Sequence, residues 1–538
     1  FGGDAIYADS TQGLDFSEFP SIKPVVRQAT PETFDAAYQT QLQNPGYQNF
    51  LQRSTNITVF GCLDDHDYGV NNGDRTYAYA RESALGFLKF INEPKQSPMY
   101  KRAERGFGLY GVKAFDFSRP PGQELLTDTE AAIDIDIDID VAANTTESSF
   151  DNSTTTQQYQ PSLSSKSVAV FILDVRTNKT PWKKGVQYDH EGDFLGERQW
   201  QWFERSLKQS TATINIIVQG LPVHAHRHPD ANAVEDWEKF PKARQRLYDA
   251  LLQSQEERGA APMLISGDVH MAQLMRSDCY FTCNNEKAAV SVKKKRSLLE
   301  ITTSGMTHSW GTCFSPQVRH HTHWYKRYAS FVSRSTMTLM HYVMQLNDVM
   351  ISHGPTSTIQ KEDEEVVSLY GNGGGEGSKL GKQYALDLNF GELEFDWERG
   401  VVIARILGVD STTTSGRSLL SASWTIDQLS GKEDMPGVMS VAEEQKIAYS
   451  ATNADDDGWR CMAHRGDTDS LRFKLGSIAL ISWVSLMVVV PLLVVPLAGL
   501  AMLLYFMFRN MPRIKICFQG FRFAASAKEE RKIKAKMN

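Results

Sequence analysis

Short, continuous apolar runs that end in polar residues are the feature that most constrains how this chain can fold. Four of them lie at 167–176 (SVAVFILDVR), 213–223 (TINIIVQGLPV), 262–270 (PMLISGDVH) and 298–305 (LLEITTSG). Such runs are typical of strands buried on both faces of a sheet. Between them, 196–209 and 241–257 have apolar residues at helical spacing, and the second begins with a proline. Alternating strands and helices predict a layered α/β fold.

The second half of the chain adds strands and two insertions to this core. Residues 384–407 have the pattern of two further strands, YALDLNFGELEFDW and VVIARIL. The segment 133–140 is a strict Ile-Asp alternation that leads into a Ser/Thr-rich run, and 354–382 is acidic and then glycine-rich. Both compositions indicate exposed, flexible insertions. The repeated Asp is a possible calcium-binding run, but it lacks the turn glycine of a calcium loop.

Composition excludes several classes of protein. The 538 residues are 41% hydrophobic and 22% charged, with a formal net charge of -7 and six cysteines. A disordered chain, a disulfide-dense mini-protein and a basic nucleic-acid binder do not have these values. A mean hydropathy of -0.37 also disfavours a transporter with many spans.

A charge-free run near the C-terminus predicts one membrane-spanning helix. Residues 475–508 contain no charged side chain, and about 20 apolar residues cross a bilayer. The following tail, 509–538, holds nine Lys or Arg and two Glu, which leaves 48 basic and 62 acidic residues upstream. The positive-inside rule then places the tail in the cytosol. We expect a type I membrane protein whose ectodomain is extracellular or in a secretory or vacuolar lumen, with membrane lipid as a partner of 475–508.

Sequons and cysteines agree with that orientation. Asn56, Asn144, Asn152 and Asn178 each begin an Asn-x-Ser/Thr sequon upstream of the span, which predicts a glycoprotein. Five cysteines lie on the same side. Three of them, Cys279, Cys283 and Cys313, are a possible metal site, but no second C-x-x-C supports zinc, and disulfide use is favoured.

Four polar clusters carry the candidate chemistry. They are 3–9 (GDAIYAD), 64–72 (DDHDYGVNN), 266–270 (SGDVH) and 304–309 (SGMTHS). Any one of them alone is more often a capping or turn motif. Together they offer carboxylates for hard cations and phenolate and imidazole for iron. A site of this kind lowers the pKa of a bound water and neutralises a phosphoryl group.

Two histidine groups have a simpler interpretation. His224, His226 and His228 alternate after a strand, and His320, His321 and His323 precede Trp324. Either group is a possible accessory metal site, but polar loops are the favoured interpretation.

The chain resembles the PhoD-like alkaline phosphatases of the calcineurin-like metallophosphoesterase superfamily. The resemblance covers 3–310 and rests on the blocks GDAIYAD (3–9), DDHDYGVNNGDR (64–75), FILDVRTN (171–178), GERQWQWFERSLKQS (196–210), WEKFPKARQRL (237–247), LISGDVHMAQL (264–274) and LEITTSGMTHS (299–309). NFGELEFDW (389–397) is similar to the closing strands of the family. The resemblance implies a four-layer α-β-β-α sandwich that hydrolyses phosphate monoesters or diesters with iron and calcium, with other divalent metals as the alternative. Its nucleophile would be a metal-activated hydroxide.

The resemblance also implies roles for individual residues. The metal ligands would be Asp4, Tyr7, Asn71, Asp268 and His270, with Asn72 as the alternative to Asn71. His66 would protonate the leaving oxygen or orient a metal-bound water. Arg176 and His308 are candidates for contact with phosphate, although an arginine at a strand end is equally often a salt-bridge partner.

The resemblance fails in one place. The family carries a Gly-Ser-Cys block with an iron-ligating cysteine before GDxxY, and here GDAIYAD begins at residue 3. We therefore expect an N-terminally truncated sequence. A catalytically inactive, membrane-tethered binding ectodomain is the alternative function. As an enzyme, the chain would act on small-molecule phosphate esters, and nucleic acid would enter only as a phosphodiester substrate.

These observations predict a definite domain organisation. The phosphatase core comprises 1–130 and 166–310, with 131–165 as a low-complexity insertion. The remaining expected segments are a helical segment 311–353, a flexible insertion 354–382, closing strands 383–425, a juxtamembrane region 426–474, the span 475–508 and the tail 509–538.

Overall fold

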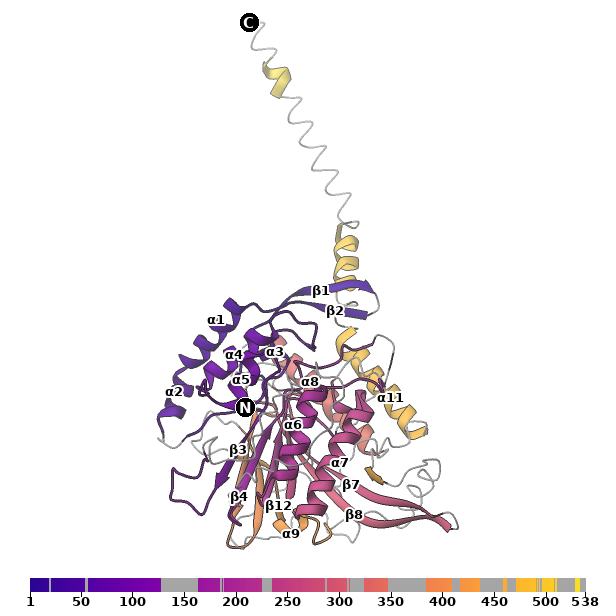
Figure 1. The fold of residues 1–538 in the computed structure, drawn as a ribbon. Coiled ribbons are helices and arrows are strands. Elements are labelled where there is room, and N and C mark those ends of the chain that lie inside the picture. The colour runs from indigo at the N-terminus through magenta and orange to yellow at the C-terminus, as the bar shows by residue number, and fades with distance from the viewer. Residues whose placement is uncertain are drawn as a thin grey trace, which may run out of the picture.

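The computed structural model describes most of the α/β core and parts of the C-terminal region (Figure 1). The described residues are 1–18, 21–53, 57–126, 163–183, 186, 188–224, 235–285, 288–306, 309, 324–346, 384–408, 417–435, 458–461, 471–489, 491, 493, 496–507, 509 and 528–532. The expected insertion 354–382, and 131–165 apart from its last three residues, lie outside this set.

One large mixed sheet forms the centre of the molecule. Its strand order is β13-β7-β8-β6-β5-β4-β3, and β9 pairs with β7. The parallel strands are β4 (Ser167–Ile172), β5 (Ile214–Val218), β6 (Ala261–Ser266) and β8 (Ala288–Thr303). The antiparallel strands are β3 (Gly111–Asp116), β7 (Ala272–Asn285), β9 (Tyr384–Ala385) and β13 (Gly458–Cys461). The four apolar runs of the sequence are strands, as predicted, and they lie side by side in this sheet.

Two crossover helices cover one face of this sheet. Helix α6 (Gly196–Gln209) links β4 to β5, and α7 (Pro241–Arg258) links β5 to β6 after the short 3-10 helix η2 (Trp237–Lys239). Trp200, Trp202 and Phe203 of α6 pack with Phe171 of β4 in one buried cluster. Both predicted helices are confirmed. Their apolar residues recur at the helical period, so one face of each helix packs on the sheet.

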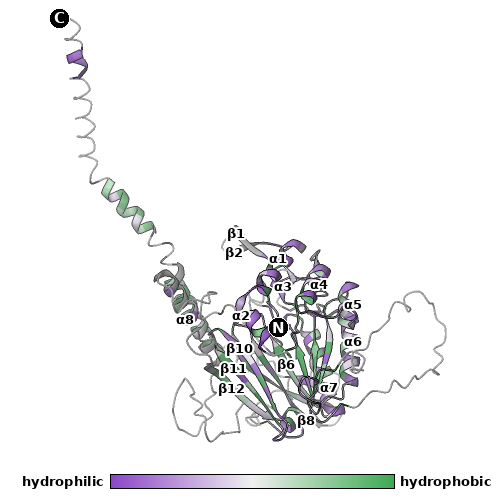
Figure 2. Cartoon of the chain, turned by 90° about the vertical axis from the view of Figure 1, so that its left-hand side faces the viewer, coloured by the Kyte–Doolittle hydropathy of each residue, from purple (hydrophilic) through white to green (hydrophobic). Residues whose placement is uncertain are grey.

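A smaller sheet covers the opposite face (Figure 2). It contains β10 (Asn389–Asp396), β11 (Val401–Gly408) and β12 (Arg417–Thr425), all antiparallel, followed by α9 (Ile426–Leu429). Val402, Ala404 and Trp424 join the buried cluster that contains Val170 and Ile216 of the large sheet. The structure supports a mixed α/β architecture. The four-layer sandwich is supported only as far as these three layers.

The N-terminal elements hold two polar segments against the sheet. They are the hairpin β1 (Ser10–Glu18) and β2 (Ser21–Arg27), and helices α1 (Pro31–Leu42), α2 (Pro45–Gln52), α3 (Asp65–Tyr68), α4 (Ala80–Phe90) and α5 (Pro98–Glu104). Tyr38, Tyr47 and Phe90 stack with ring centroids 4.9–5.6 Å apart. A parallel bridge joins Gly2 to Cys62, which places segments 1–9 and 61–72 next to each other.

The C-terminal region supplies a helix pair. Helix α8 (Trp324–Leu346) lies within the expected helical segment 311–353 and packs on α11 (Leu471–Val484) and the π-helical turn η5 (Ser485–Val489). The Tyr328 hydroxyl donates to the Met487 carbonyl at 2.6 Å. In the part of the chain that the structure describes, no helix is both long enough and apolar enough to cross a membrane. The single spanning helix expected over 475–508 is therefore not found there.

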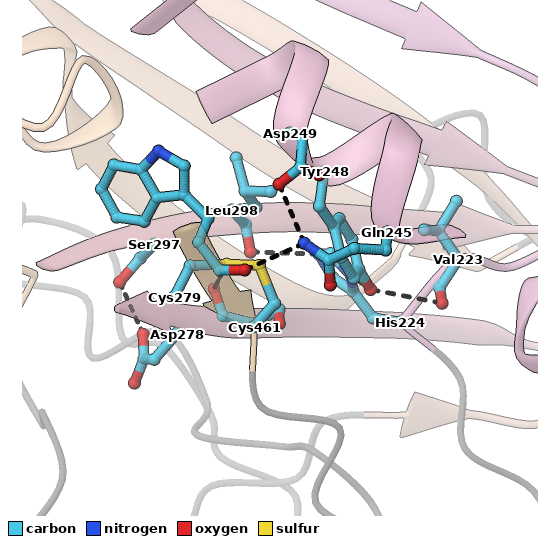
Figure 3. Close-up of a disulfide and its surroundings, with 12 residues drawn as sticks. Val223, His224, Gln245, Tyr248, Asp249, Asp278, Cys279, Ser297, Leu298 and Cys461 are labelled. Atoms are coloured by element: carbon cyan, nitrogen blue, oxygen red, sulfur yellow. Dashed lines mark hydrogen bonds between the residues drawn. A yellow bond between two sulfur atoms is a disulfide. The ribbon is translucent and has the colours of Figure 1, made fainter. Parts of the chain in front are cut away.

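A disulfide links Cys279 of β7 to Cys461 of β13 (Figure 3). The expected use of cysteine in disulfides is confirmed for this pair, and Cys279 cannot ligate a metal in this state. Beside it, His224 is buried, with its ring nitrogens 2.9 Å from the Tyr248 hydroxyl and 3.1 Å from the Leu298 carbonyl. His224 is thus a hydrogen-bonded core residue, while His226 and His228 lie outside the described residues.

Candidate metal centre

The carboxyl ends of the parallel strands meet at one edge of the large sheet, and the candidate site lies there. Asp268 follows β6, Arg176 follows β4, and Gly220 follows β5. The N-terminal segment adds Asp4 and Tyr7 to this edge, and α3 begins at the N-cap Asp64 and ends at Gly69, whose φ is 108°. This edge is where open α/β sheets bind their ligands.

The backbone is unusual at this edge. Asp4, Asn72, Asp268 and His270 are non-glycine residues with positive φ, at 51°, 59°, 64° and 50°. Left-handed backbone is costly for residues with a Cβ and clusters at functional sites. Gly220 is required here for a different reason, since a Cβ would lie 2.7 Å from the Asp64 carboxylate. Asp64 therefore packs directly on the loop after β5.

Two overlapping groups of side chains are arranged to hold cations. One contains Asp4, Asp65 and His66, and the other contains Asp64, Asp65 and Asp268. In each group the potential ligand atoms lie within 4.8 Å of one another. Asp65 belongs to both groups, so the arrangement can place two cations side by side.

Three buried carboxylate oxygens at this site have no hydrogen-bond partner among the described residues. They are Asp4 Oδ1, Asp64 Oδ2 and Asp65 Oδ1. An unpartnered, buried carboxylate oxygen is costly, because burial removes the water that would otherwise solvate it. Oxygen-rich sets of this kind suit hard cations such as calcium, and added imidazole suits iron. The residues present therefore fit a metal site.

The electrostatics agree with a need for positive charge. Burial and the neighbouring Asp65 and Asp64 raise the pKa of Asp4 well above its usual range. Burial and the same two carboxylates do the same for Asp268. Burial also raises the pKa of Asp64 to about 6, against the opposing effect of Arg176. Each raised pKa indicates that the ionised carboxylate is disfavoured here unless a positive charge compensates it.

Asp65 is the exception among these carboxylates. Burial opposes its ionisation, but Arg176, His66 and the Asn72 amide outweigh burial and lower its pKa. The Asn72 backbone N–H donates to Asp65 Oδ2 at 2.8 Å. Asp65 is therefore the carboxylate most readily ionised before a cation arrives.

His66 and Tyr7 lie at the outer side of the site. The Tyr7 hydroxyl donates to Asp4 Oδ2 at 3.1 Å, and its ring centroid lies 4.3 Å from that of His66. His66 Nδ1 is 2.7 Å from Asp9 Oδ1, while its Nε2 lies 3.9 Å from Asp65. Burial alone would lower the pKa of His66, but the bond to Asp9 and the charge of Asp65 raise it to about 9. These contacts favour the protonated form of His66.

The other residues singled out from the sequence lie as follows. Arg176 is fully buried and pairs with Asp64 and Glu235, so its guanidinium serves ion pairs in this structure. Asn71 is exposed, and its backbone N–H donates to Asp9 Oδ2 at 3.1 Å. His270 follows Asp268 but belongs to neither carboxylate group, and its backbone N–H donates to Ser304. His308 lies outside the described residues.

Several residues of the site were not singled out from the sequence. Asp64 and Asp65 belong to the DDHD cluster, but the family resemblance assigns neither of them a ligand role. Asp9 ends the 3–9 cluster, whereas Lys179 and Glu235 lie outside all the motif blocks. One sequence pattern indicates a buried ion-pair network: two basic residues, Arg176 and Lys179, follow closely after a buried strand.

Comparison with known proteins agrees with the sequence resemblance. Residues 153–341 match the sequence model of the PhoD-like phosphatase family. The resemblance to this family is thereby confirmed for that segment, which contains Arg176, Lys179, Glu235, Asp268 and His270. Asp4, Tyr7 and the DDHD run lie outside it.

One solved structure similar to this chain is titled "Structure of PhoD". It shares 13% sequence identity with a TM-score of 0.30, over 52% of this chain and 46% of that one. The chain thus matches about half the length of that protein. No curated protein matches the chain.

Proposed function

We propose that this chain is a metal-dependent phosphatase that hydrolyses phosphate monoesters, diesters or both. The observation that carries the proposal is the set of unpartnered, buried oxygens on Asp4, Asp64 and Asp65, beside Asp268 at the carboxyl edge of the sheet. The family match over 153–341 supplies the reaction class. The alternative is an inactive binding ectodomain, which would have no need for buried carboxylates with free oxygens.

Asp4, Asp64, Asp65 and Asp268 are the residues that would hold the cations, with Tyr7 beside Asp4. Iron and calcium are the proposed metals, by resemblance to the family. Bound cations would lower the pKa of a water and neutralise charge on the phosphoryl group.

The protein's own groups supply positioning and proton transfer. Asp9 fixes the His66 ring through Nδ1, which leaves Nε2 facing the carboxylates. Protonated His66 would donate to the leaving oxygen, a role typically worth about 10²–10⁴-fold in rate. Buried Arg176 compensates the charge of Asp64 without leaving its ion pair.

We also propose that the protein is membrane-anchored through 475–508, with the phosphatase outside the cytosol. The charge-free run and the basic tail support this orientation. The Cys279–Cys461 disulfide supports an oxidising compartment. Of the four sequons, only Asn178 lies among the described residues. Its amide donates to the Phe107 carbonyl at 3.4 Å, so glycans are expected on the other three.

The proposal is tested by assaying the full chain on a chromogenic phosphomonoester and a phosphodiester, with calcium and iron supplied. We expect turnover by the wild type and its loss in Asp268→Ala. Asp35→Ala removes an exposed carboxylate from α1 and should retain full activity. No turnover by the metal-loaded wild type would favour the inactive ectodomain.

A further inference from the structure

Glu235 lies behind the candidate metal centre, and its carboxylate is almost completely buried at 3% exposure. Its Oε2 accepts a hydrogen bond from Arg176 Nη1. Its Oε1 accepts from Lys179 Nζ and from the Trp182 indole. Arg176 and Lys179 are themselves fully buried. Burying a carboxylate with two charged side chains has a high desolvation cost. A role of Glu235 would therefore lie in the contacts that Arg176 and Lys179 make with other residues.

Arg176, the first of these two basic side chains, contacts Asp64. Arg176 Nε donates to Asp64 Oδ1 at 2.8 Å, and Nη2 donates to the same oxygen. With Oδ1 held, Asp64 Oδ2 is left as the unpartnered oxygen that faces the carboxylate group. Glu235, which accepts from Nη1, fixes the guanidinium on its other side.

Lys179, the second basic side chain, is connected to Asp65 through the backbone of Asn72. Lys179 Nζ donates to the carbonyl oxygens of Asn72 at 2.9 Å and Gly73 at 3.2 Å. The Asn72 backbone N–H in turn donates to Asp65 Oδ2. This leaves Asp65 Oδ1 as the unpartnered oxygen. The hydrogen bond from Lys179 to the Asn72 carbonyl thus stabilises the left-handed backbone of Asn72, whose φ is 59°.

We propose that Glu235 is a positioning residue that orients Asp64 and Asp65 together for cation binding, through Arg176 and Lys179. Glu235 also balances the positive charges of Arg176 and Lys179. Arg176 Nη2 lies 4.0 Å from Asp268 Oδ1, so a guanidinium released from Glu235 could neutralise the carboxylates that the metal needs. The inference rests on the proposed function, because the cations in question are those of the phosphatase site.

The test uses Glu235→Gln in the full chain, with binding of Ca²⁺ alone and of Mn²⁺ alone measured by calorimetry. Gln keeps the shape of the side chain but removes its charge and one acceptor. Removing a residue that hydrogen-bonds a metal ligand typically weakens metal binding about 10- to 100-fold. Glu235 acts one residue further out, so we expect a loss at the lower end of this range, about 10-fold. The matched control is Glu256→Gln. Glu256 also pairs with one lysine and one arginine, Lys294 and Arg296, but on α7 and β8. Its cation affinity should equal that of the wild type.

A double-mutant cycle with Lys179→Gln tests the path. If Glu235 acts through Lys179, the double variant loses less affinity than the product of the two single losses. Lys179→Gln alone should weaken cation binding, which keeps the test readable if Glu235→Gln does not fold. Wild-type affinity in a folded Glu235→Gln, wild-type affinity in Lys179→Gln, or losses that simply multiply would each overturn the proposal. A wild type that binds neither cation would overturn it along with the metal site. A cation-binding wild type that hydrolyses no ester would count against the proposed function alone.

Discussion

At the scale of single residues, the pair formed by His66 and Asp9 makes a prediction about pH. The hydrogen bond to Asp9 and the charge of Asp65 raise the pKa of His66 to about 9 against the effect of burial, so Asp9→Asn should lower it. His66 would then lose its proton at a lower pH. The alkaline limb of the kcat/KM profile should move to lower pH in Asp9→Asn and stay in place in Asp35→Asn. An unmoved limb in Asp9→Asn would show that His66 does not supply the proton.

At the scale of elements, the disulfide between β7 and β13 fixes a short strand to the sheet. Its two cysteines are 182 residues apart in sequence. Because cross-links of this kind chiefly restrict the unfolded chain, Cys461→Ser should lower the free energy of unfolding by about 2–4 kcal/mol. Urea unfolding of the variant measures this loss, and reduced wild type should unfold at the same urea concentration. Equal midpoints for the variant and oxidised wild type would contradict the prediction.

The same region contains a buried histidine whose pKa opposes protonation. Burial lowers the pKa of His224 to about 3, whereas an unfolded histidine titrates near 6.5. The unfolded chain therefore binds the extra proton first, and stability falls as pH drops below about 6.5. His224→Gln should flatten this acid slope in urea unfolding between pH 6.5 and pH 4. An unchanged slope would assign the acid sensitivity to other groups.

Elements also show how far the sequence alone could reach. The runs at 167–176 and 213–223 became β4 and β5 because strands buried on both faces are continuous apolar segments. The long β7–β8 hairpin was missed, since Lys293 to Arg296 interrupts the apolar pattern of β8. The sequence does not separate Asp65 from Asn71 as a candidate ligand, because they differ only in the tertiary structure: Asp65 is buried in α3, and Asn71 is exposed. Glu235 reaches the site only through side chains distant in sequence.

At the scale of the whole molecule, the candidate site should couple stability to pH and to bound cations. Burial raises the pKa of Asp67 to about 7, although backbone amides oppose this, and raises that of Asp64 to about 6. Unfolded aspartates titrate near 3.9, so the unfolded chain releases these protons first, and stability falls as pH rises from about 4 to 7. Cations bound at Asp64 would favour its ionised form and reduce this loss.

The resulting prediction concerns a difference in melting temperature. Ca²⁺ should raise the melting temperature more at pH 7.5 than at pH 5. Taking the difference with and without Ca²⁺ cancels the acid slope of His224, which lies away from the site. Glu256→Gln should respond to Ca²⁺ like the wild type. An increase that is larger at pH 5 would contradict the assignment of these carboxylates.

The most direct test of the central claim is the cation content of the protein. Asp65 belongs to both carboxylate groups, so its loss affects both. Wild type and Asp65→Asn, stripped with chelator and dialysed against calcium and iron, are compared by elemental analysis, with Asp35→Asn as control. Bound metal in the wild type and in Asp35→Asn, and its loss in Asp65→Asn, is the predicted result. Equal metal content in wild type and Asp65→Asn, or none in the wild type, would contradict the account.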